Sequence, residues 1–175
     1  MPTKEESTIK VLVREYLLDE GILKKRIKNE KLEFGFQFSF PPGPRGQNLA
    51  VIKPKDRDLL IITLGTQISK PHVEALNSSP NKKLRFFNAL RKFLLVQNLL
   101  FRIDVQHYRF EISDQYFLED SESLSKNAFY QLIRGVFSGA AYANILLGEY
   151  CSGKIKPEDF DKSRDFSGSD FSLYT

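Results

Sequence analysis

The segment from Leu32 to Phe40 reads Leu-Glu-Phe-Gly-Phe-Gln-Phe-Ser-Phe, with a large apolar side chain at every second position. Successive side chains of a β-strand point to opposite faces of the sheet. The alternation therefore predicts one strand with an aromatic face, made by Phe34, Phe36, Phe38 and Phe40. Such a face serves packing, either in the protein's own core or against a partner. It indicates a sheet and carries no chemistry of its own.

The size and composition of the chain are those of an ordinary globular protein. Its 175 residues are 41% apolar and 27% charged, which suits one domain with a short extension. We predict a single domain over residues 1–153 and a flexible tail over residues 154–175. Cys151 is the only cysteine, so no internal disulfide can form. The charged start of the chain and the lack of a long apolar run lead us to expect a cytoplasmic protein.

Patterns on either side of the aromatic strand predict the other elements. Apolar residues at helical spacing predict helices over residues 8–19, 80–97 and 124–150, with a short helix after Ser69. Strands are predicted over residues 22–27, 32–40, 48–53, 58–66, 99–106 and 109–117. Hairpins rather than parallel crossovers connect these strands. The sequence therefore predicts an α+β fold in the order α-ββββ-α-ββ-α, with helices flanking an antiparallel sheet.

Two of the predicted helices have informative faces. The helix over residues 80–97 is interpreted as burying one stripe of large side chains: Leu84, Phe87, Leu90, Leu94 and Leu95. The last helix carries a run of small residues: Gly135, Gly139, Ala140, Ala141 and Ala143. Small side chains let another backbone approach closely, and we take this face as one reason to expect a dimer.

Catalytic and metal-binding patterns are sparse. His72 and His107 are the only histidines, and neither belongs to a paired His or Cys spacing of the kind that metal sites need. Cys151, at the end of a helix, is interpreted as a small buried residue. The chain has no nucleophile elbow, Walker loop or dinucleotide fingerprint. We expect no enzyme activity, metal or cofactor, although a site of dispersed carboxylates in a polar pocket stays open as an alternative.

Positive charge is concentrated in the first two-thirds of the chain. Residues 1–117 have a net charge of +7 and residues 118–175 a net charge of −3. A basic surface can attract nucleic acid. The candidate contacts for that alternative are Lys24, Lys25, Arg26, Lys53, Lys55 and Arg57. If these side chains share one exposed face the alternative gains weight, and if they are dispersed it loses weight.

The end of the chain repeats an acidic–aromatic pair. Asp159-Phe160, Asp165-Phe166 and Asp170-Phe171 follow one another at intervals of six and five residues, and Leu173-Tyr174 comes after them. Isolated aromatic residues in a polar segment are typical of peptides that dock into grooves as they fold. The candidate partner-binding residues are Phe34, Phe36, Phe38, Phe40, Phe160, Phe166, Phe171 and Tyr174.

The order of these elements resembles that of a known fold family. The points of similarity are Gly21 after the first helix, the hairpin into Phe34-Gly-Phe36-Gln-Phe38, the helix with Phe87-Asn88-Ala89-Leu90, and the last helix. Over residues 7–152 the chain resembles the type III secretion chaperone-like fold, which YbjN-like proteins share. It is also similar to uncharacterised archaeal proteins of a domain-of-unknown-function family.

The resemblance implies a protein that binds other proteins and has no catalytic role. Members of the secretion-chaperone family form dimers through a central helix and strand region, and they bind extended partner segments along the sheet. This chain departs from them in being basic and in carrying an extra tail. We therefore predict a homodimeric adaptor or chaperone-like module with a protein partner, and nucleic-acid binding is the alternative.

Overall fold

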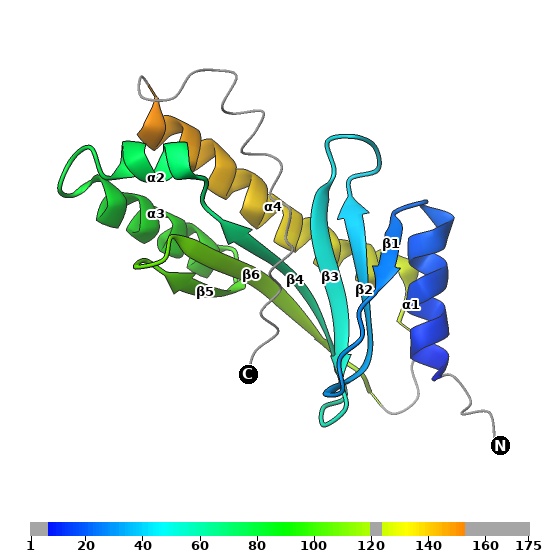
Figure 1. The fold of residues 1–175 in the computed structure, drawn as a ribbon. Helices are drawn as coiled ribbons and strands as arrows, with labels where there is room; N and C mark the ends of the chain where they lie inside the picture. The colour runs from blue at the N-terminus through cyan, green and yellow to red at the C-terminus, as the bar shows by residue number, and fades with distance from the viewer. Residues whose placement is uncertain (1–6, 120–123, 153–175) are drawn as a thin grey trace. The chain divides into compact units, whose positions relative to one another are not determined.

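The computed structural model describes residues 7–119 and 124–152 (Figure 1). Its helices and strands, in chain order, are α1 (Thr8–Asp19), β1 (Leu23–Arg26), β2 (Leu32–Phe40), β3 (Gln47–Pro54), β4 (Leu59–Gln67), α2 (Lys70–Leu76), α3 (Lys82–Val96), β5 (Leu100–Asp104), β6 (Arg109–Phe117) and α4 (Lys126–Cys151). The strands form an antiparallel sheet in the order β1-β2-β3-β4-β6-β5. The predicted α+β fold class is confirmed.

The element bounds follow the sequence patterns closely. The first helix, the aromatic strand and the strand over residues 109–117 have the predicted bounds, and the other four strands differ by one or two residues at their ends. Helix α3 begins at Lys82 after Asn81, two residues later than the predicted start. Ser125 accepts a hydrogen bond from the backbone N–H of Ala128 at the start of α4. Ser123, which precedes the predicted helix over residues 124–150, lies outside the described residues.

The described chain divides into two compact units. Unit 1 comprises residues 7–62, 115–119 and 124–134, and unit 2 comprises residues 63–114 and 135–152. Strands β4 and β6 and helix α4 each contribute residues to both units. The single domain over residues 1–153 stays a prediction. The predicted tail over residues 154–175 lies outside the described residues.

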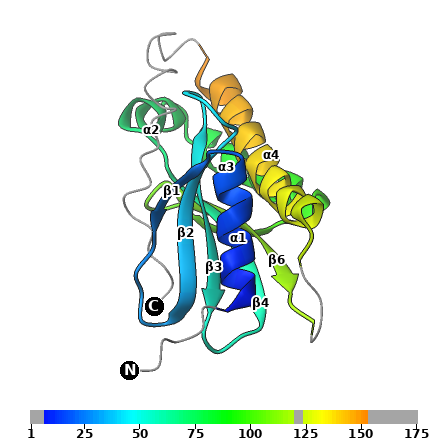
Figure 2. The ribbon, with the colours of Figure 1, turned by 90° about the vertical axis from the view of Figure 1, so that its right-hand side faces the viewer.

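The aromatic face of β2 forms the core of unit 1. Phe34, Phe36 and Phe38 are 2%, 3% and 0% exposed. Antiparallel pairing sets Phe36 opposite Val51 and Phe38 opposite Leu49 on β3, and side chains directly opposite one another share a face. Helix α1, which runs alongside β1 and β2 in Figure 2, buries two side chains of its own, Val13 and Leu17.

Two tyrosines join α1 to the beginning of α4 in unit 1. The Tyr16 hydroxyl donates to the backbone oxygen of Leu124 at 2.7 Å. The Tyr130 hydroxyl donates to the backbone oxygen of Tyr16 at 2.8 Å, and burial raises the pKa of Tyr130 to about 12, with smaller contributions from Glu20 and Asp19. These reciprocal hydrogen bonds hold α1 against the beginning of α4.

Gly35 interrupts the large side chains of β2 for a packing reason. A Cβ atom at this position would lie 3.1 Å from the Cβ of Ile27 and 3.3 Å from atoms of Ile52 and Leu32. Only a residue without a side chain leaves room for this small cluster on the second face of the strand. Both faces of β2 are therefore packed in its central part.

The core of unit 2 is built on α3 and the second half of α4. The buried stripe of α3 consists of Phe86, Phe87, Leu90 and Leu94. The interpretation that placed Leu84 and Leu95 in that stripe was wrong, because these two side chains are 54% and 63% exposed. At 3.6 residues per turn, Leu84 lies far around the helix from the centre of the buried stripe.

The small residues of α4 are used within unit 2. A Cβ on Gly139 would lie 3.0 Å from Cδ1 of Leu99 and 3.3 Å from Ile112 and Leu94. The backbone of α4 thus approaches the side chains of α3 and β6 closely in the same unit. The close approach expected from the small residues is real, but the side chains that make it at Gly139 belong to this chain.

Candidate functional site

The outward side of α3 is the most unusual surface among the described residues. Its exposed side chains are Leu84, Arg85, Asn88, Lys92, Leu95 and Val96, and we call this set the outer face of α3. Leu84 and Leu95 are eleven residues apart, close to three full turns, so they lie along one line of the helix. Val96 is 80% exposed. Along the helix, Arg85 and Lys92 thus lie between Leu84 and the pair Leu95 and Val96.

The charges of α3 oppose the dipole of the helix. Lys82, Lys83 and Arg85 stand in or beside its first turn, which has no acidic residue. Cations near a helix N-terminus are unfavourable, and a capping side chain normally offsets the exposed N–H groups. The Asn81 side chain makes no capping hydrogen bond. The buried stripe holds the helix in place, and α3 as a whole carries five cations with no anion to balance them.

Aromatic contacts define how α3 and α4 lie in unit 2. The rings of Phe93 and Tyr142 stack with centroids 3.6 Å apart, and those of Phe86 and Tyr150 meet edge-on at 6.0 Å. Moving along α3 from residue 86 to 93 therefore means moving back along α4 from 150 to 142. The two helices run antiparallel, and the C-terminal end of α4 lies beside the N-terminal part of α3.

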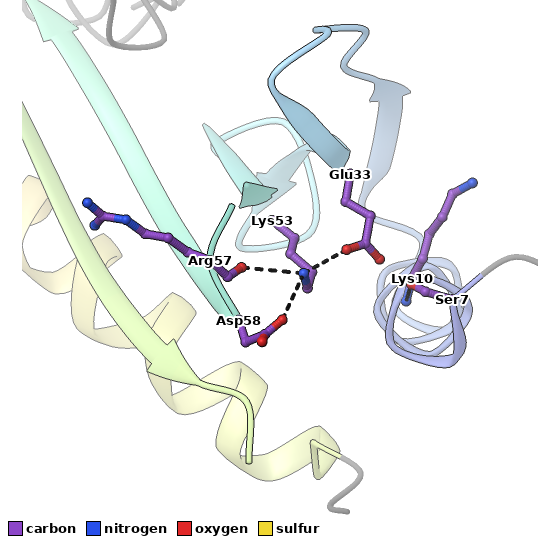
Figure 3. A network of polar contacts seen from close by, with 6 residues as sticks. All are labelled: Ser7, Lys10, Glu33, Lys53, Arg57 and Asp58. Carbon is purple, nitrogen blue, oxygen red and sulfur yellow. Dashed lines mark hydrogen bonds and ion pairs between the residues drawn. The ribbon is translucent and has the colours of Figure 1, made fainter. Parts of the chain in front are cut away.

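A polar network in unit 1 surrounds Lys53 (Figure 3). The Nζ of Lys53 lies 2.6 Å from a carboxylate oxygen of Glu33 and 3.5 Å from one of Asp58. It also lies 3.4 Å from the backbone oxygen of Arg57. The Lys53 side chain is 7% exposed, so its charge is neutralised inside the fold rather than offered to solvent.

The network sets the ionisation of Glu33. Partial burial by itself would raise the pKa of this carboxyl. The hydrogen bonds from Lys53 and Ser7 and the charges of Lys53 and Lys10 outweigh that effect and lower the pKa below its ordinary value. The ionised carboxylate is therefore more favourable in the folded state than in the unfolded chain, which links stability to pH.

We expect Glu33→Gln to lower the free energy of unfolding by about 1–2 kcal/mol at pH 7, since it leaves the buried ammonium of Lys53 poorly matched. A carboxyl whose pKa is lowered on folding stabilises the protein above its unfolded pKa, and that contribution is lost as the pH falls through the folded value. Urea unfolding of the wild type and the variant between pH 3 and 7 measures the difference.

The difference between the two proteins should therefore be constant near neutral pH and shrink in acid. Glu30→Gln, an exposed position in the turn between β1 and β2, is the matched control and should change stability by less than about 0.5 kcal/mol at any pH. A wild-type advantage over Glu33→Gln that stays the same at pH 3 would contradict this role of Glu33.

The predicted partner-binding aromatic residues of β2 are mostly inside the fold. Phe34, Phe36 and Phe38 are buried, so the described structure offers a partner none of their surface. Phe40 is half-buried, and its ring centroid lies 6.3 Å from that of Tyr130 on α4. The other predicted residues, Phe160, Phe166, Phe171 and Tyr174, lie outside the described residues, and their role stays a prediction.

The predicted nucleic-acid residues do not share one exposed face. Lys25 pairs with Gln37 and Arg26 with Phe36 across the β1–β2 ladder, and neighbouring residues of a strand point to opposite faces. Lys53 is buried against Glu33. Lys24, Lys25 and Arg26 on β1 are exposed, as are Lys55 and Arg57 in the turn between β3 and β4. This dispersal lowers the weight of the nucleic-acid alternative at these positions.

Little in the described residues points to redox or metal chemistry. Cys151 is fully buried, its Sγ lies 3.8 Å from the backbone oxygen of His72, and burial raises its pKa to about 11, so the thiolate is disfavoured. Across residues 7–119 and 124–152, no three His, Cys, Asp or Glu side chains gather where they could hold a metal ion. The described helices are too short or too polar to cross a membrane.

Comparison with known proteins places the chain in a family. Residues 9–147 match the family model described as "Uncharacterized conserved protein (DUF2299)". The chain belongs to the DUF2299 family. The match spans α1 to nearly the end of α4, so it covers both units. A search of curated proteins gave no match to this DUF2299 chain.

Two solved structures share the fold of this DUF2299 protein. An uncharacterized protein from Methanothermobacter thermautotrophicus matches with a TM-score of 0.70 and 21% identity, over 80% of this chain and 96% of that one. The crystal structure of the ExsC–ExsE complex matches with a TM-score of 0.53 and 15% identity, over 83% of this chain and 97% of the other. The predicted resemblance to archaeal proteins and to the type III secretion chaperone fold is confirmed.

Proposed function

We propose that this DUF2299 protein is a non-catalytic protein-binding module, an adaptor or chaperone-like protein that acts as a homodimer. The observation that carries the proposal is the outer face of α3, where Leu84, Leu95 and Val96 are 54%, 63% and 80% exposed on one helix. Exposed apolar patches with a polar rim commonly serve protein interaction. The shared fold adds support, since ExsC was crystallised in a complex with ExsE.

The composition of this face favours a particular kind of partner. Arg85 and Lys92 lie between Leu84 and the pair Leu95 and Val96, and α3 contains no acidic residue. Complementary charges steer association, while like charges placed together oppose it. An amphipathic partner segment with apolar anchors and acidic neighbours fits the face better than the same face of a second copy does.

The homodimer is proposed to use other exposed apolar side chains. The candidates are two exposed side chains on strands β5 and β6, Leu100 and Phe117. Cyclic dimers are the commonest oligomers of soluble proteins. Light scattering at tens of micromolar protein should give twice the chain mass of 20.2 kDa. A monomeric mass over this concentration range would remove the dimer from the proposal.

Capture of partners from lysate tests the function itself. Tagged full-length protein is incubated with source lysate, with and without nuclease, and bound protein and nucleic acid are both identified. We expect a bound protein that survives nuclease treatment. Recovery of nucleic acid alone, or of proteins that nuclease releases, would favour the nucleic-acid alternative, whose binding should also weaken steeply with salt.

A further inference from the structure

We propose that the acidic–aromatic segment at the end of this same chain, residues 159–166, occupies the outer face of α3 and competes with the protein partner. This regulatory role rests on the proposed function in taking that face as the binding face. The segment supplies two Asp-Phe pairs, Asp159-Phe160 and Asp165-Phe166. In the docked arrangement the phenyl rings contact the exposed leucines and the carboxylates lie near the cations.

Charge is the first argument for this occupant. The outer face carries Arg85 and Lys92 between apolar side chains, and the helix has no carboxylate of its own to neutralise them. Residues 159–166 hold three Asp against Lys162 and Arg164, a net charge of −1. Each Phe directly follows an Asp, so a negative charge accompanies each apolar anchor. Docking would then be stabilised both by the burial of apolar surface and by an attraction between charges that salt weakens.

The path of the chain is the second argument. The ring contact between Phe86 and Tyr150 sets the end of α4 beside the N-terminal part of α3. The described residues end at Ser152, so the following segment starts beside the N-terminal part of α3, on the side of Phe86. Leu84 lies about 160° around the helix from Phe86, so the segment has to pass around α3 to reach it. Phe160 comes eight residues after Ser152, and eight steps can span up to about 28 Å when extended. Phe160 can therefore reach Leu84 with slack in the connection.

Spacing is the third argument. Leu84 and Leu95 are separated by about 17 Å along the axis of α3, at 1.5 Å per residue. Phe160 and Phe166 are six residues apart, which corresponds to about 20 Å in an extended chain. One extended segment running along α3 can thus set Phe160 against Leu84 and Phe166 near Leu95 and Val96.

Disulfide cross-linking in the full-length chain tests this placement. In a Cys151→Ala background, Leu84→Cys is combined with Phe160→Cys, and the rate of intramolecular disulfide formation under mild oxidation is measured by mass spectrometry. The matched control combines Ile145→Cys with Phe160→Cys. Ile145 is exposed on α4 only seven residues before Ser152, so an undocked segment would reach it at least as readily.

We expect the Leu84–Phe160 pair to link at least about tenfold faster than the control, because docking raises the effective concentration of one thiol near the other. Adding Asp159→Lys and Asp165→Lys should lower the rate toward that of the control, and so should high salt. The pair Leu95→Cys with Phe166→Cys should behave in the same way. The assay needs no partner, so its outcome is independent of whether lysate capture succeeds.

Three results would overturn the inference. Equal rates for the test pair and the control would show that the segment does not favour α3. A disulfide that forms between two chains rather than within one would assign the face to a second copy. The face would be assigned to nucleic acid if the cross-linking rates were equal and the protein were retained on an oligonucleotide column. In that case the variant Arg85→Glu/Lys92→Glu would no longer be retained.

Discussion

Replacing Phe38 by alanine should lower the free energy of unfolding by about 3–5 kcal/mol, because the ring is fully buried and the cavity cannot collapse completely. Phe38 is 0% exposed and lies opposite Leu49, which is also fully buried. Denaturant unfolding of both proteins measures the loss. The same experiment decides whether the aromatic face of β2 is the core of unit 1 or a contact surface.

Phe40→Ala is the matched control on the same face of the same strand. Phe40 is only half-buried at the end of β2, so its truncation removes less apolar contact and should cost less than about 2 kcal/mol. If Phe38→Ala left the unfolding free energy almost unchanged but altered the mass in light scattering, the ring would be serving an interface, and the assignment to the core would be wrong.

Replacing Gly139 by leucine should destabilise the fold by about 2–3 kcal/mol through overpacking. The new side chain would begin 3.0 Å from Leu99 and meet Ile112 and Leu94 at 3.3 Å, and Leu94 and Ile112 are fully buried. Thermal unfolding of the wild type and the variant measures the cost. If the small residues of α4 serve internal packing, this change lowers stability. If they serve dimer formation, it changes the oligomeric mass instead.

Gly135→Ala is the matched control one turn away. A Cβ there would meet Leu99 at 3.8 Å, an ordinary contact, and alanine is the better helix former by about 0.5–1 kcal/mol. We expect unchanged or slightly higher stability. A Gly139→Leu protein that kept wild-type stability but lost its oligomeric mass would contradict the internal use of this face.

The fold was largely predictable because its strongest patterns are local. The alternation over Leu32–Phe40 specifies a strand with one aromatic face, and Ser7 and Gly21 mark the ends of α1, where Ser7 caps the helix and Gly21 adopts a φ of +65°. Such signals depend on neighbouring residues alone. They predict where elements begin and end without any knowledge of what packs against them.

The candidate site was harder to predict because exposure depends on tertiary contacts. Large apolar side chains occur on several sides of α3, so the sequence alone did not show that Leu84 and Leu95 face outward. A signal was present in the five cations of the helix and the missing acidic residue in its first turn. Cations gathered on an amphipathic helix mark the side that is not buried.

Lys53 shows the opposite case. In the sequence it belongs to a basic cluster with Lys55 and Arg57. Lys53 lies opposite Phe34, which sets it on the core side of β3. Glu33, the ion-pair partner of Lys53, lies at the register shift between Leu32 and Phe34. Irregular register of this kind depends on how two strands pair, so composition could not reveal that this lysine is buried.

The most direct test compares lysate capture by wild-type protein with capture by Leu84→Asp/Leu95→Asp, after nuclease treatment. Both replaced side chains are exposed, so the variant should fold with an unchanged unfolding midpoint, and Leu18→Asp on α1 is the matched control. We predict that wild type and Leu18→Asp retain the same protein partner and that the double variant loses at least about 90% of it, as expected for loss of central apolar anchors. Equal capture by all three proteins, or no nuclease-resistant partner for any of them, would contradict the account.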